Sequence, residues 1–248
     1  MYILIHFLKP KSFLSDLIPD NFIDIHSHLL PGIDDGATTI DDTLSLMTQM
    51  KSFGFENFIT TPHIITNVWN NNEQSIPLKF NETNKLLENK IAIHSFGYAA
   101  EYMMDSFFME KIEKQQLLTF KEKHILVEIS YLSPPLQLYD IIFELQLSGY
   151  KPIFAHPERY LFYHNNFSEY EKLKKAGCLF QLNLLSSVGY YGSNVTKIAG
   201  LLLEKGYIDF VGSDVHHQNH INAFNQKVTL KNLKPLEEAI SNNLFFLK

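Results

Sequence analysis

The sequence is poor in the residues that several common kinds of site require. It has a single cysteine, Cys178, among 248 residues, which excludes an intramolecular disulfide and a thiolate-rich zinc site. Lysine and arginine number 21 against 27 acidic residues, giving a net charge of -6, and they cluster only as short pairs such as Lys174-Lys175. Nucleic-acid binding through a basic face is therefore not expected.

Long apolar runs are also missing. No stretch approaches the roughly 20 apolar residues that a membrane-spanning helix needs. The apolar start, Met1 to Leu8, precedes the basic Lys9-Pro10-Lys11 instead of following it, and no small-residue cleavage site is present. We therefore expect neither a signal peptide nor membrane insertion, and a cytoplasmic location.

The sequence does contain enough apolar residues, 45%, for one large core. Short apolar segments alternate with segments of helical periodicity, which is typical of a parallel α/β fold. We expect one domain over residues 1–248, with residues 1–20 as an N-terminal extension that packs on the outside or on a partner. The predicted strands are 22–25, 57–61, 91–97, 125–129, 152–155, 179–183 and 208–212. The predicted helices are 41–53, 78–89, 135–147, 168–175, 193–205 and 235–243, with a mobile polar loop at 66–75. Ser168 and Glu171 are expected to form a capping box at the start of the helix 168–175.

Two histidines stand just past the first predicted strand. Because strand side chains alternate between faces, His26 and His28 are expected to point the same way. Neutral imidazole is among the commonest metal ligands. Asp34 and Asp35 follow on a loop punctuated by glycine and proline, which allows a carboxylate to bend back toward the pair.

Similar side chains follow other predicted strands. Taken singly, each can be explained as part of a turn or as a solvated side chain. However, all of them lie just past the carboxyl ends of predicted strands: His63, Glu101, His156, Asp214 and His216. In a barrel the carboxyl ends of all strands meet at one mouth, whereas the first and seventh strands of an open sheet lie apart. The set therefore favours a barrel with a metal site. Oxygen and nitrogen ligands without sulfur suit manganese, iron, zinc or magnesium, and their number suits two or three ions.

These residues occur in motifs that resemble a known family. Asp24-x-His-x-His, Thr61-Pro62-His63, Ala155-His-Pro-Glu-Arg159 and Ser213-Asp-x-His216 are similar to the polymerase-and-histidinol-phosphatase (PHP) superfamily. The longer string from Asp24 to Ala37 resembles its CpsB/YwqE-type branch of bacterial manganese-dependent protein tyrosine phosphatases. The resemblance runs from about residue 22 to 220. It implies a distorted TIM-like (β/α)7 barrel and a centre of three metal ions.

The resemblance also implies roles for individual residues. One ion would be held by His26, His28, Glu101 and Asp214, and Glu101 would bridge to a second ion held by His63 and His156. Asp35 and His216 would hold or face a third ion, and both are candidates for a catalytic role. Arg159 would bind the phosphate. Metal coordination would bring the pKa of a water molecule to about 7, which supplies the hydroxide that attacks phosphorus.

One position departs from the family pattern. A basic residue commonly follows the Asp-x-His motif and helps to bind phosphate, whereas this chain has His217-Gln-Asn-His220. Either histidine could replace it only when protonated. The aromatic residues Tyr160, Phe162 and Tyr163 either stack on a phosphotyrosine ring or serve packing alone.

The resemblance implies that the substrate is a bacterial tyrosine kinase that controls capsular or exopolysaccharide synthesis. Two alternatives stay open: a small-molecule phosphatase of the histidinol-phosphatase kind, and an inactive metal-binding module that docks on such a kinase. A cysteine-based phosphatase is excluded, because that chemistry needs an arginine six positions after the cysteine and residue 184 is leucine. Cys178 is expected to be a core residue.

Overall fold

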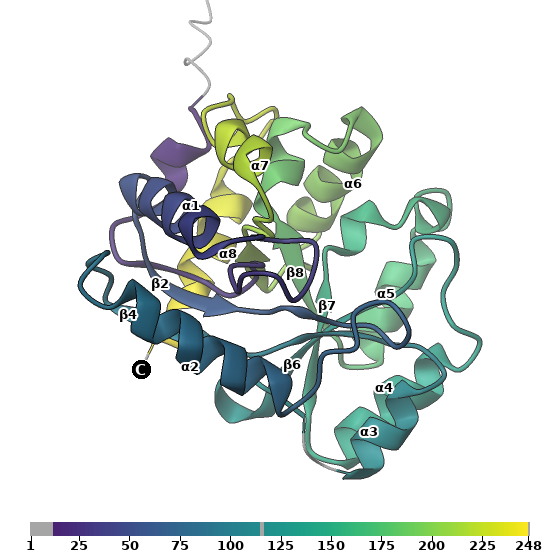
Figure 1. Ribbon diagram of the computed structural model, residues 1–248. Coiled ribbons are helices and arrows are strands. Elements are labelled where there is room, and N and C mark those ends of the chain that lie inside the picture. The colour runs from purple at the N-terminus through teal and green to yellow at the C-terminus, as the bar shows by residue number, and fades with distance from the viewer. Residues whose placement is uncertain (1–11, 115–116, 248) are drawn as a thin grey trace, which may run out of the picture.

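The computed structural model describes residues 12–114 and 117–247. Figure 1 shows helices surrounding a central set of strands. Within the described residues the strands are β1 (Phe22–Asp24), β2 (Phe55–Thr60), β3 (His63–Ile64), β4 (Ser95–Tyr98), β5 (Glu101–Met103), β6 (His124–Glu128), β7 (Lys151–Ala155), β8 (Leu179–Asn183) and β9 (Phe210–Gly212). The helices there are α1 (Ile40–Ser52), α2 (Ser75–Leu87), α3 (Phe108–Lys114), α4 (Leu138–Leu147), α5 (Ser168–Lys175), α6 (Ser193–Glu204), α7 (Gln218–Ala223) and α8 (Lys234–Asn242). Short 3₁₀ helices include η3 (Pro157–Arg159), η4 (Leu161–Tyr163), η5 (Leu184–Val188) and η6 (Asn243–Phe246).

All strand pairs are parallel, in the orders β1-β2-β4 and β3-β5-β6-β7-β8-β9. The strands β3 and β5 continue β2 and β4 after breaks at Thr61-Pro62 and Ala99-Ala100. Proline lacks the N–H that a strand ladder uses, which explains the first break. Backbone bonds cross both breaks, from Ala99 N to Thr60 O at 2.9 Å and from Glu101 N to Pro62 O at 3.1 Å. The two sheets therefore form one surface with seven strand positions.

The first and last strands close this surface into a barrel. Just past the ends of β1 and β9, Asp214 N donates to His26 O at 2.7 Å and His28 N donates to Val215 O at 3.0 Å. These bonds confirm the distorted (β/α)7 barrel, and they bring the residues after β1 and β9 side by side at its mouth.

Deeper in the barrel, a side chain completes the junction of β1 and β9. The buried Asn243 donates from Nδ2 to Ile23 O at 3.0 Å and to Val211 O at 2.9 Å. Its Oδ1 accepts from Val211 N at 3.1 Å. One amide thus satisfies backbone groups of both strands where they do not bond each other directly. We call this junction, from Asn243 up to His28, the seam.

The barrel interior is apolar and filled. Alternate residues along β1, β6, β7 and β9 point inward and form one cluster with Phe120 and with Phe246 of η6. The members of this cluster on or next to these strands are Ile23, Ile25, Leu126, Ile153, Ala155 and Phe210. A larger cluster packs the helices against the outside of the strands. With the interior filled, the open positions for polar side chains are at the carboxyl ends of the strands.

Most expected elements are present, with some corrections. The expected strand at 91–97 is shorter and later, as β4, and β3, β5, α3 and α7 were not expected from the sequence. The expected capping box of Ser168 and Glu171 is wrong. Phe167 occupies the N-cap position of α5 in helical geometry and makes no side-chain cap bond, so Ser168 already lies inside the helix. The polar loop at 66–75 contains a turn in which Ile65 and Trp69 exchange backbone bonds.

The described part of the N-terminal extension packs on the outside of the barrel. Leu14 is buried, and its N donates to Gln226 O at 3.0 Å, while Ser15 N donates to Phe224 O at 3.0 Å. Residues 1–11 of the expected extension lie outside the described residues. Among the helices of the described ranges, none is both long and apolar enough to cross a membrane.

Candidate metal centre

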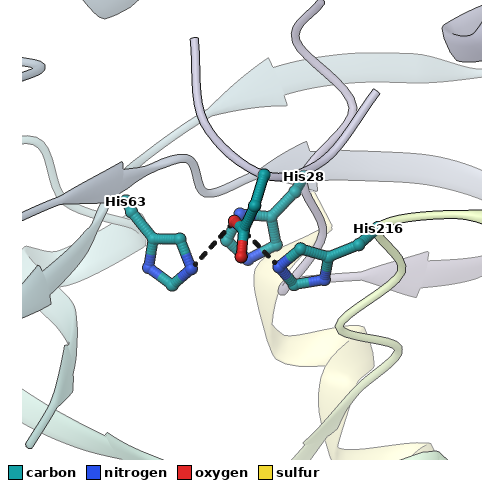
Figure 2. Close-up of side chains that lie close together, drawn as sticks. His28, His63 and His216 are labelled. Carbon is teal, nitrogen blue, oxygen red and sulfur yellow. Dashed lines mark ion pairs between the residues drawn. The ribbon is translucent and has the colours of Figure 1, made fainter. Parts of the chain in front are cut away.

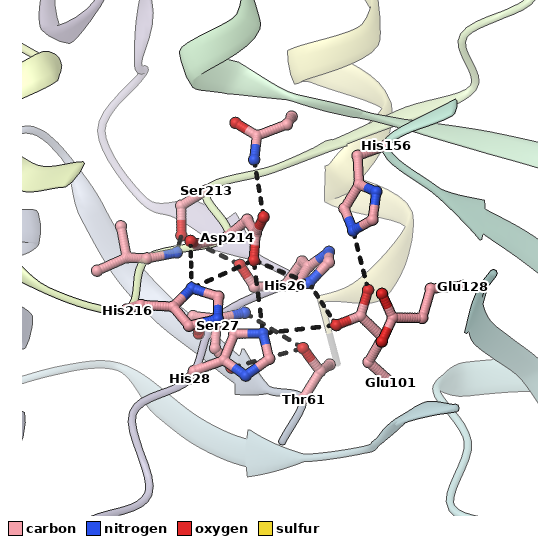
Figure 3. Close-up of polar contacts among 12 residues, drawn as sticks. His26, Ser27, His28, Thr61, Glu101, Glu128, His156, Ser213, Asp214 and His216 are labelled. Carbon is pink, nitrogen blue, oxygen red and sulfur yellow. Dashed lines mark hydrogen bonds and ion pairs between the residues drawn. The ribbon is translucent and has the colours of Figure 1, made fainter. Parts of the chain in front are cut away.

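Four buried side chains from opposite sides of the seam and from β5 meet at the barrel mouth. The Nε2 atoms of His26 and His28 lie 3.2 and 3.6 Å from Glu101 Oε2. The same two nitrogen atoms lie 3.3 and 3.5 Å from Asp214 Oδ1. Figure 3 shows the two imidazoles turned toward these carboxylates. The expectation that both histidines face the same way is confirmed.

Glu101 also contacts ligand atoms from other strands. Its Oε2 lies 3.1 Å from Nδ1 of His63, and its Oε1 lies 3.1 Å from Nε2 of His156. Glu128, at the end of β6, places Oε1 3.0 Å from His63 Nδ1. The geometry thus groups His63 with Glu101 and Glu128, and His156 with Glu101 and His26. Glu101 joins the two groups, and Glu128 lies beside His63 as a further possible ligand that the resemblance did not imply.

A further group lies closer to solvent. Asp35 Oδ1 is 3.5 Å from Nε2 of His63 and 3.4 Å from Nε2 of His216. Figure 2 shows the rings of His28, His63 and His216 close together, and Asp35 belongs to the same group of possible ligands. The Asp35 side chain is 55% exposed, whereas the carboxylates of Glu101 and Asp214 are buried. The loop after β1 therefore does return Asp35 to the histidines.

Several of these buried polar atoms have no hydrogen-bond partner among the described residues. They face one another across short distances without hydrogen-bond geometry: His26 Nε2, His28 Nε2, His63 Nδ1, Glu101 Oε2 and Glu128 Oε1. Buried polar atoms in folded proteins are nearly always paired, so such a group requires a ligand. Imidazole nitrogens and carboxylate oxygens aimed at common points fit divalent cations.

Second contacts hold two of the imidazoles in place. His26 Nδ1 lies 2.7 Å from Gln181 Oε1, and His28 Nδ1 lies 2.8 Å from Asp34 Oδ2. The same oxygen of Asp34 accepts from the backbone N of His63 at 3.2 Å. Because the Nδ1 atom of each ring donates to these oxygens, Nε2 presents its lone pair to the centre.

The electrostatics of the centre also suit cations. Burial by itself lowers the pKa of His26, but the charges of Glu101 and Asp214 raise it to about 10. Burial by itself raises the pKa of both carboxyls, but the nearby histidines hold these pKa values well below the ordinary range. The carboxylates thus stay ionised, and a positive charge must balance them. Protons supply it on the bare ligands, and divalent cations supply it when they displace those protons.

The backbone is strained at two positions in the mouth. His156 and Asp214 have φ values of 35° and 51°, in the left-handed region that non-glycine residues seldom adopt. Such strain persists where surrounding contacts enforce it, and it is concentrated at functional sites. Gly212 lies two residues before Asp214, at the end of β9, and a Cβ there would lie 2.6 Å from both His26 Cβ and Gln181 Nε2. Only glycine leaves room for the imidazole at this level.

Arg159 stands at the rim of the centre. It follows β7 in η3, and its Nη1 donates to Asp214 Oδ2 at 2.6 Å. Its guanidinium carbon lies 5.0 Å from the ring centroid of Tyr131 and 4.2 Å from that of Tyr191. Asn183 Nδ2 donates to the same Asp214 oxygen at 2.9 Å, which leaves Oδ1 to face the histidines. The sequence expectation that places Arg159 near the metal ligands thus agrees with the geometry.

The sequence of this chain matches a known protein family over nearly its whole length. A model of the family described as capsular polysaccharide synthesis, CpsB/CapC, matches residues 22–246. The chain belongs to the CpsB/CapC family. This CpsB/CapC member is 30% identical to the tyrosine-protein phosphatase YwqE of Bacillus subtilis over 91% of this chain and 87% of that protein. It is 27% identical to the tyrosine-protein phosphatase CpsB of Streptococcus pneumoniae over 79% and 83%.

Solved structures agree with this membership. The CpsB/CapC chain matches a crystal structure from a study of YwqE of Bacillus subtilis and CpsB of Streptococcus pneumoniae, described as unique metal-dependent tyrosine phosphatases. The TM-score is 0.78 at 28% identity, over 91% of this chain and 94% of the other. The resemblance drawn from the motifs is therefore confirmed at the level of family and fold.

His217 and His220 stand where the family pattern has a basic residue in this CpsB/CapC chain. His220 is buried, its Nδ1 accepts from the backbone N of His216 at 3.1 Å, and burial lowers its pKa to about 3. Burial also lowers the pKa of His217. Both shifts disfavour the protonated imidazoles that phosphate binding at these two positions would need.

The aromatic residues after Arg159 serve packing in two of three cases. Tyr160 is fully buried, and its hydroxyl accepts from Ile129 N at 3.1 Å. Tyr163 is also buried, whereas Phe162 is partly exposed. Stacking of Tyr160 or Tyr163 on a substrate ring is therefore wrong. Cys178 is a buried core residue, as expected.

Glu128 and Gln181 were missed in the sequence, and Asp34 was singled out only as one of two carboxylates on the loop after the first strand. Glu128 carries the same signal as the others, a carboxylate at the end of an apolar strand, and could have been found. Asp34 and Gln181 act through the rings of His28 and His26. Their contacts depend on the folded loop and on the pairing of distant strands, which no local pattern reveals.

Proposed function

We propose that this protein is a metal-dependent protein-tyrosine phosphatase that hydrolyses phosphotyrosine on other proteins. One observation carries the proposal: buried imidazole and carboxylate atoms without partners converge at the barrel mouth, beside a single arginine. Relatives that align over most of their length are named tyrosine-protein phosphatases, which supports the same reaction here.

The ligand groups suit two or three divalent ions, with manganese as the proposed metal. His26, His28 and Asp214 would hold one ion, and His63, Glu101 and Glu128 a second. Glu101 lies within reach of both groups, and His156 approaches its other oxygen. Asp35 and His216, with His28 and His63, would face a third ion. When bound, such ions lower the pKa of a coordinated water and neutralise phosphate charge.

Arg159 is the proposed phosphate-binding residue. A guanidinium has five N–H donors in a fixed plane, so Arg159 keeps its bond to Asp214 while its other donors bind phosphate oxygens. The rings of Tyr131 and Tyr191 hold this plane in position. A tyrosyl leaving group has a pKa of about 10, so protonation of that group assists the reaction without being essential. His216 is a candidate donor if it does not ligate a metal.

The proposed substrate is a phosphorylated bacterial tyrosine kinase that controls capsular or exopolysaccharide synthesis, encountered in the cytoplasm. The description of the family, capsular polysaccharide synthesis, supports this choice. The small-molecule phosphatase and the inactive docking module are the alternatives that the experiment must separate.

The test compares a phosphotyrosine peptide with histidinol phosphate as substrates for metal-stripped protein, before and after addition of manganese. We expect manganese to restore hydrolysis of the peptide by several orders of magnitude. His26→Ala should abolish the restored activity, because it removes a ligand atom from two groups. Arg159→Ala should raise KM for the peptide and lower kcat, with metal content unchanged by elemental analysis.

Preference for histidinol phosphate would contradict the tyrosine phosphatase. Full metal occupancy with turnover of neither substrate would instead favour the docking module. Leu147→Ser is a suitable control in both assays, because this exposed residue lies at the far end of α4.

A further inference from the structure

An exposed apolar surface adjoins the candidate metal centre. The loop between β6 and α4 carries Leu132, 91% exposed, and Leu136, fully exposed, together with Pro134. We call Tyr131, Leu132, Pro134, Leu136 and Phe162 the rim surface. Leucine side chains that project into solvent in one loop, beside two prolines, form a patch typical of an interaction site.

The rim surface is continuous with the mouth through Tyr131. The hydroxyl of Tyr131 lies 3.5 Å from His156 Nδ1, and its ring stacks against the guanidinium of Arg159. Tyr131 is 45% exposed, so a phosphorylated side chain that reaches Arg159 must pass beside its ring. Whatever segment carries that side chain then lies next to Leu132.

A cavity of about 350 Å³ lies at the other end of the rim surface. Its walls come from the start of α4 and from the segment after Arg159, and include Pro134, Leu136 and Phe162. The ring of the buried Tyr160 lies between Tyr131 and Phe162, with ring centroids 5.5 Å from Tyr131 and 5.8 Å from Phe162, and these two steps set the largest separation that the two rings of the rim surface can have. An extended peptide covers two such steps in about three residues. The cavity is large enough for one apolar side chain.

We propose that the rim surface binds an apolar residue of the substrate about three positions from the phosphotyrosine. The inference rests on the proposed phosphatase function and adds the chemistry of the sequence that the enzyme selects. The occupant is the phosphorylated segment itself, since the surface begins at the residue that contacts Arg159 and His156. Arg159 supplies the charge for phosphate, and the rim surface supplies the apolar contacts that distinguish one phosphotyrosine sequence from another.

The test uses the full chain loaded with manganese and four substrates. Three are phosphotyrosine peptides with leucine three residues before, leucine three residues after, or serine at both places. The fourth is p-nitrophenyl phosphate, which is too small to reach the cavity. The variants are the double change Leu132→Ser with Leu136→Ser, and Leu147→Ser as the matched control on the outward face of α4, 70% exposed.

We expect the wild-type enzyme to hydrolyse one leucine peptide with kcat/KM about tenfold above that of the serine peptide. The double variant should lose this preference through KM, and Leu147→Ser should keep it. Hydrolysis of p-nitrophenyl phosphate should be the same in all three proteins. All altered side chains are exposed, so the fold should tolerate the changes.

A preference that survives in the double variant would overturn the inference, and so would an equal loss with p-nitrophenyl phosphate. Sedimentation identifies the other possible occupant: if the double variant turns a dimer into a monomer and Leu147→Ser does not, the rim surface binds a second copy of the chain and the inference is wrong. Failure of the wild-type enzyme on every phosphotyrosine peptide would instead refute the proposed function, and it is visible before any variant is compared.

Discussion

At the scale of single residues, the candidate metal centre depends on side chains that hold the ligand residues in place without being ligands themselves. Both oxygens of the Asp34 carboxylate are used: Oδ2 by His28 Nδ1 and the His63 backbone, and Oδ1 by Gly36 N at 3.0 Å. Burial by itself raises the pKa of Asp34, but the nearby His28 lowers it below the ordinary value, so the group stays ionised. An ionised carboxylate accepts at all three places at once.

Asp34→Asn should weaken manganese binding about 10- to 100-fold, because an amide has one accepting oxygen and leaves a contact of His28 or Gly36 unmade. Titration with manganese against a competing chelator measures this directly. Asp41→Asn, an exposed change in α1, is the control. Unchanged affinity in Asp34→Asn would mean that His28 is oriented by other contacts.

The position of each residue relative to a strand also determines which site residues can be recognised in the sequence. His26, His63, Glu101 and Asp214 could be found because each follows a short apolar strand, and the barrel brings all strand ends together. The role of Asp34 could not be found, because Asp34 and Asp35 are adjacent and the folded loop alone decides which of them contacts His28 Nδ1 and which contacts His216.

At the scale of elements, two helix starts with the same sequence signal differ in structure. Thr39 accepts from Asp42 N at 3.1 Å and Asp42 accepts from Thr39 N at 2.8 Å, which is a complete capping box on α1. Ser168 in α5 follows a residue that is already helical, and its hydroxyl donates to Asn166 Oδ1 at 2.8 Å instead. The four-residue signal predicts that a helix starts nearby, but the preceding backbone decides which residue caps it.

Thr39→Ala should therefore lower the free energy of unfolding by about 1 kcal/mol, while Ser168→Ala should leave it nearly unchanged. Urea denaturation of the two variants and the wild type gives both values. Equal losses would show that α5 uses Ser168 as a cap in solution. Neither change should alter metal content, because both helices pack on the outside of the barrel (Figure 1).

At the scale of the whole molecule, the fold depends on a junction between distant parts of the chain. Asn243 lies 220 residues from Ile23, whose carbonyl it binds, and Ser213 lies 189 residues from Asp24, whose carboxylate accepts from its hydroxyl at 2.6 Å. The parallel α/β class follows from alternating segments, but nothing local to residue 243 identifies it as part of a strand junction. The strand-end residues and the motifs predict a barrel, but the residues that form the seam come only from the structure.

Asn243→Ala should destabilise the protein by about 2 to 4 kcal/mol, because it leaves two carbonyls and one N–H of β1 and β9 buried without partners. Thermal unfolding measures the loss, with the exposed Asn225→Ala as control. Manganese should recover part of the stability, since metal ligands lie on both sides of the seam. A variant as stable as the control would mean that the backbone hydrogen bonds at the barrel mouth, from Asp214 N to His26 O and from His28 N to Val215 O, hold the seam without Asn243.

The seam also fixes when the protein acquires its metal. A ribosome that adds roughly 5 to 20 residues per second makes Asn243 about ten to forty seconds after His26 and His28. For most of that interval the two histidines are in the cell without Asp214 or His216, and any ion they meet is held by an incomplete set of ligands. The lasting choice of metal therefore falls after synthesis, and it reflects the ions available when the newly finished barrel closes.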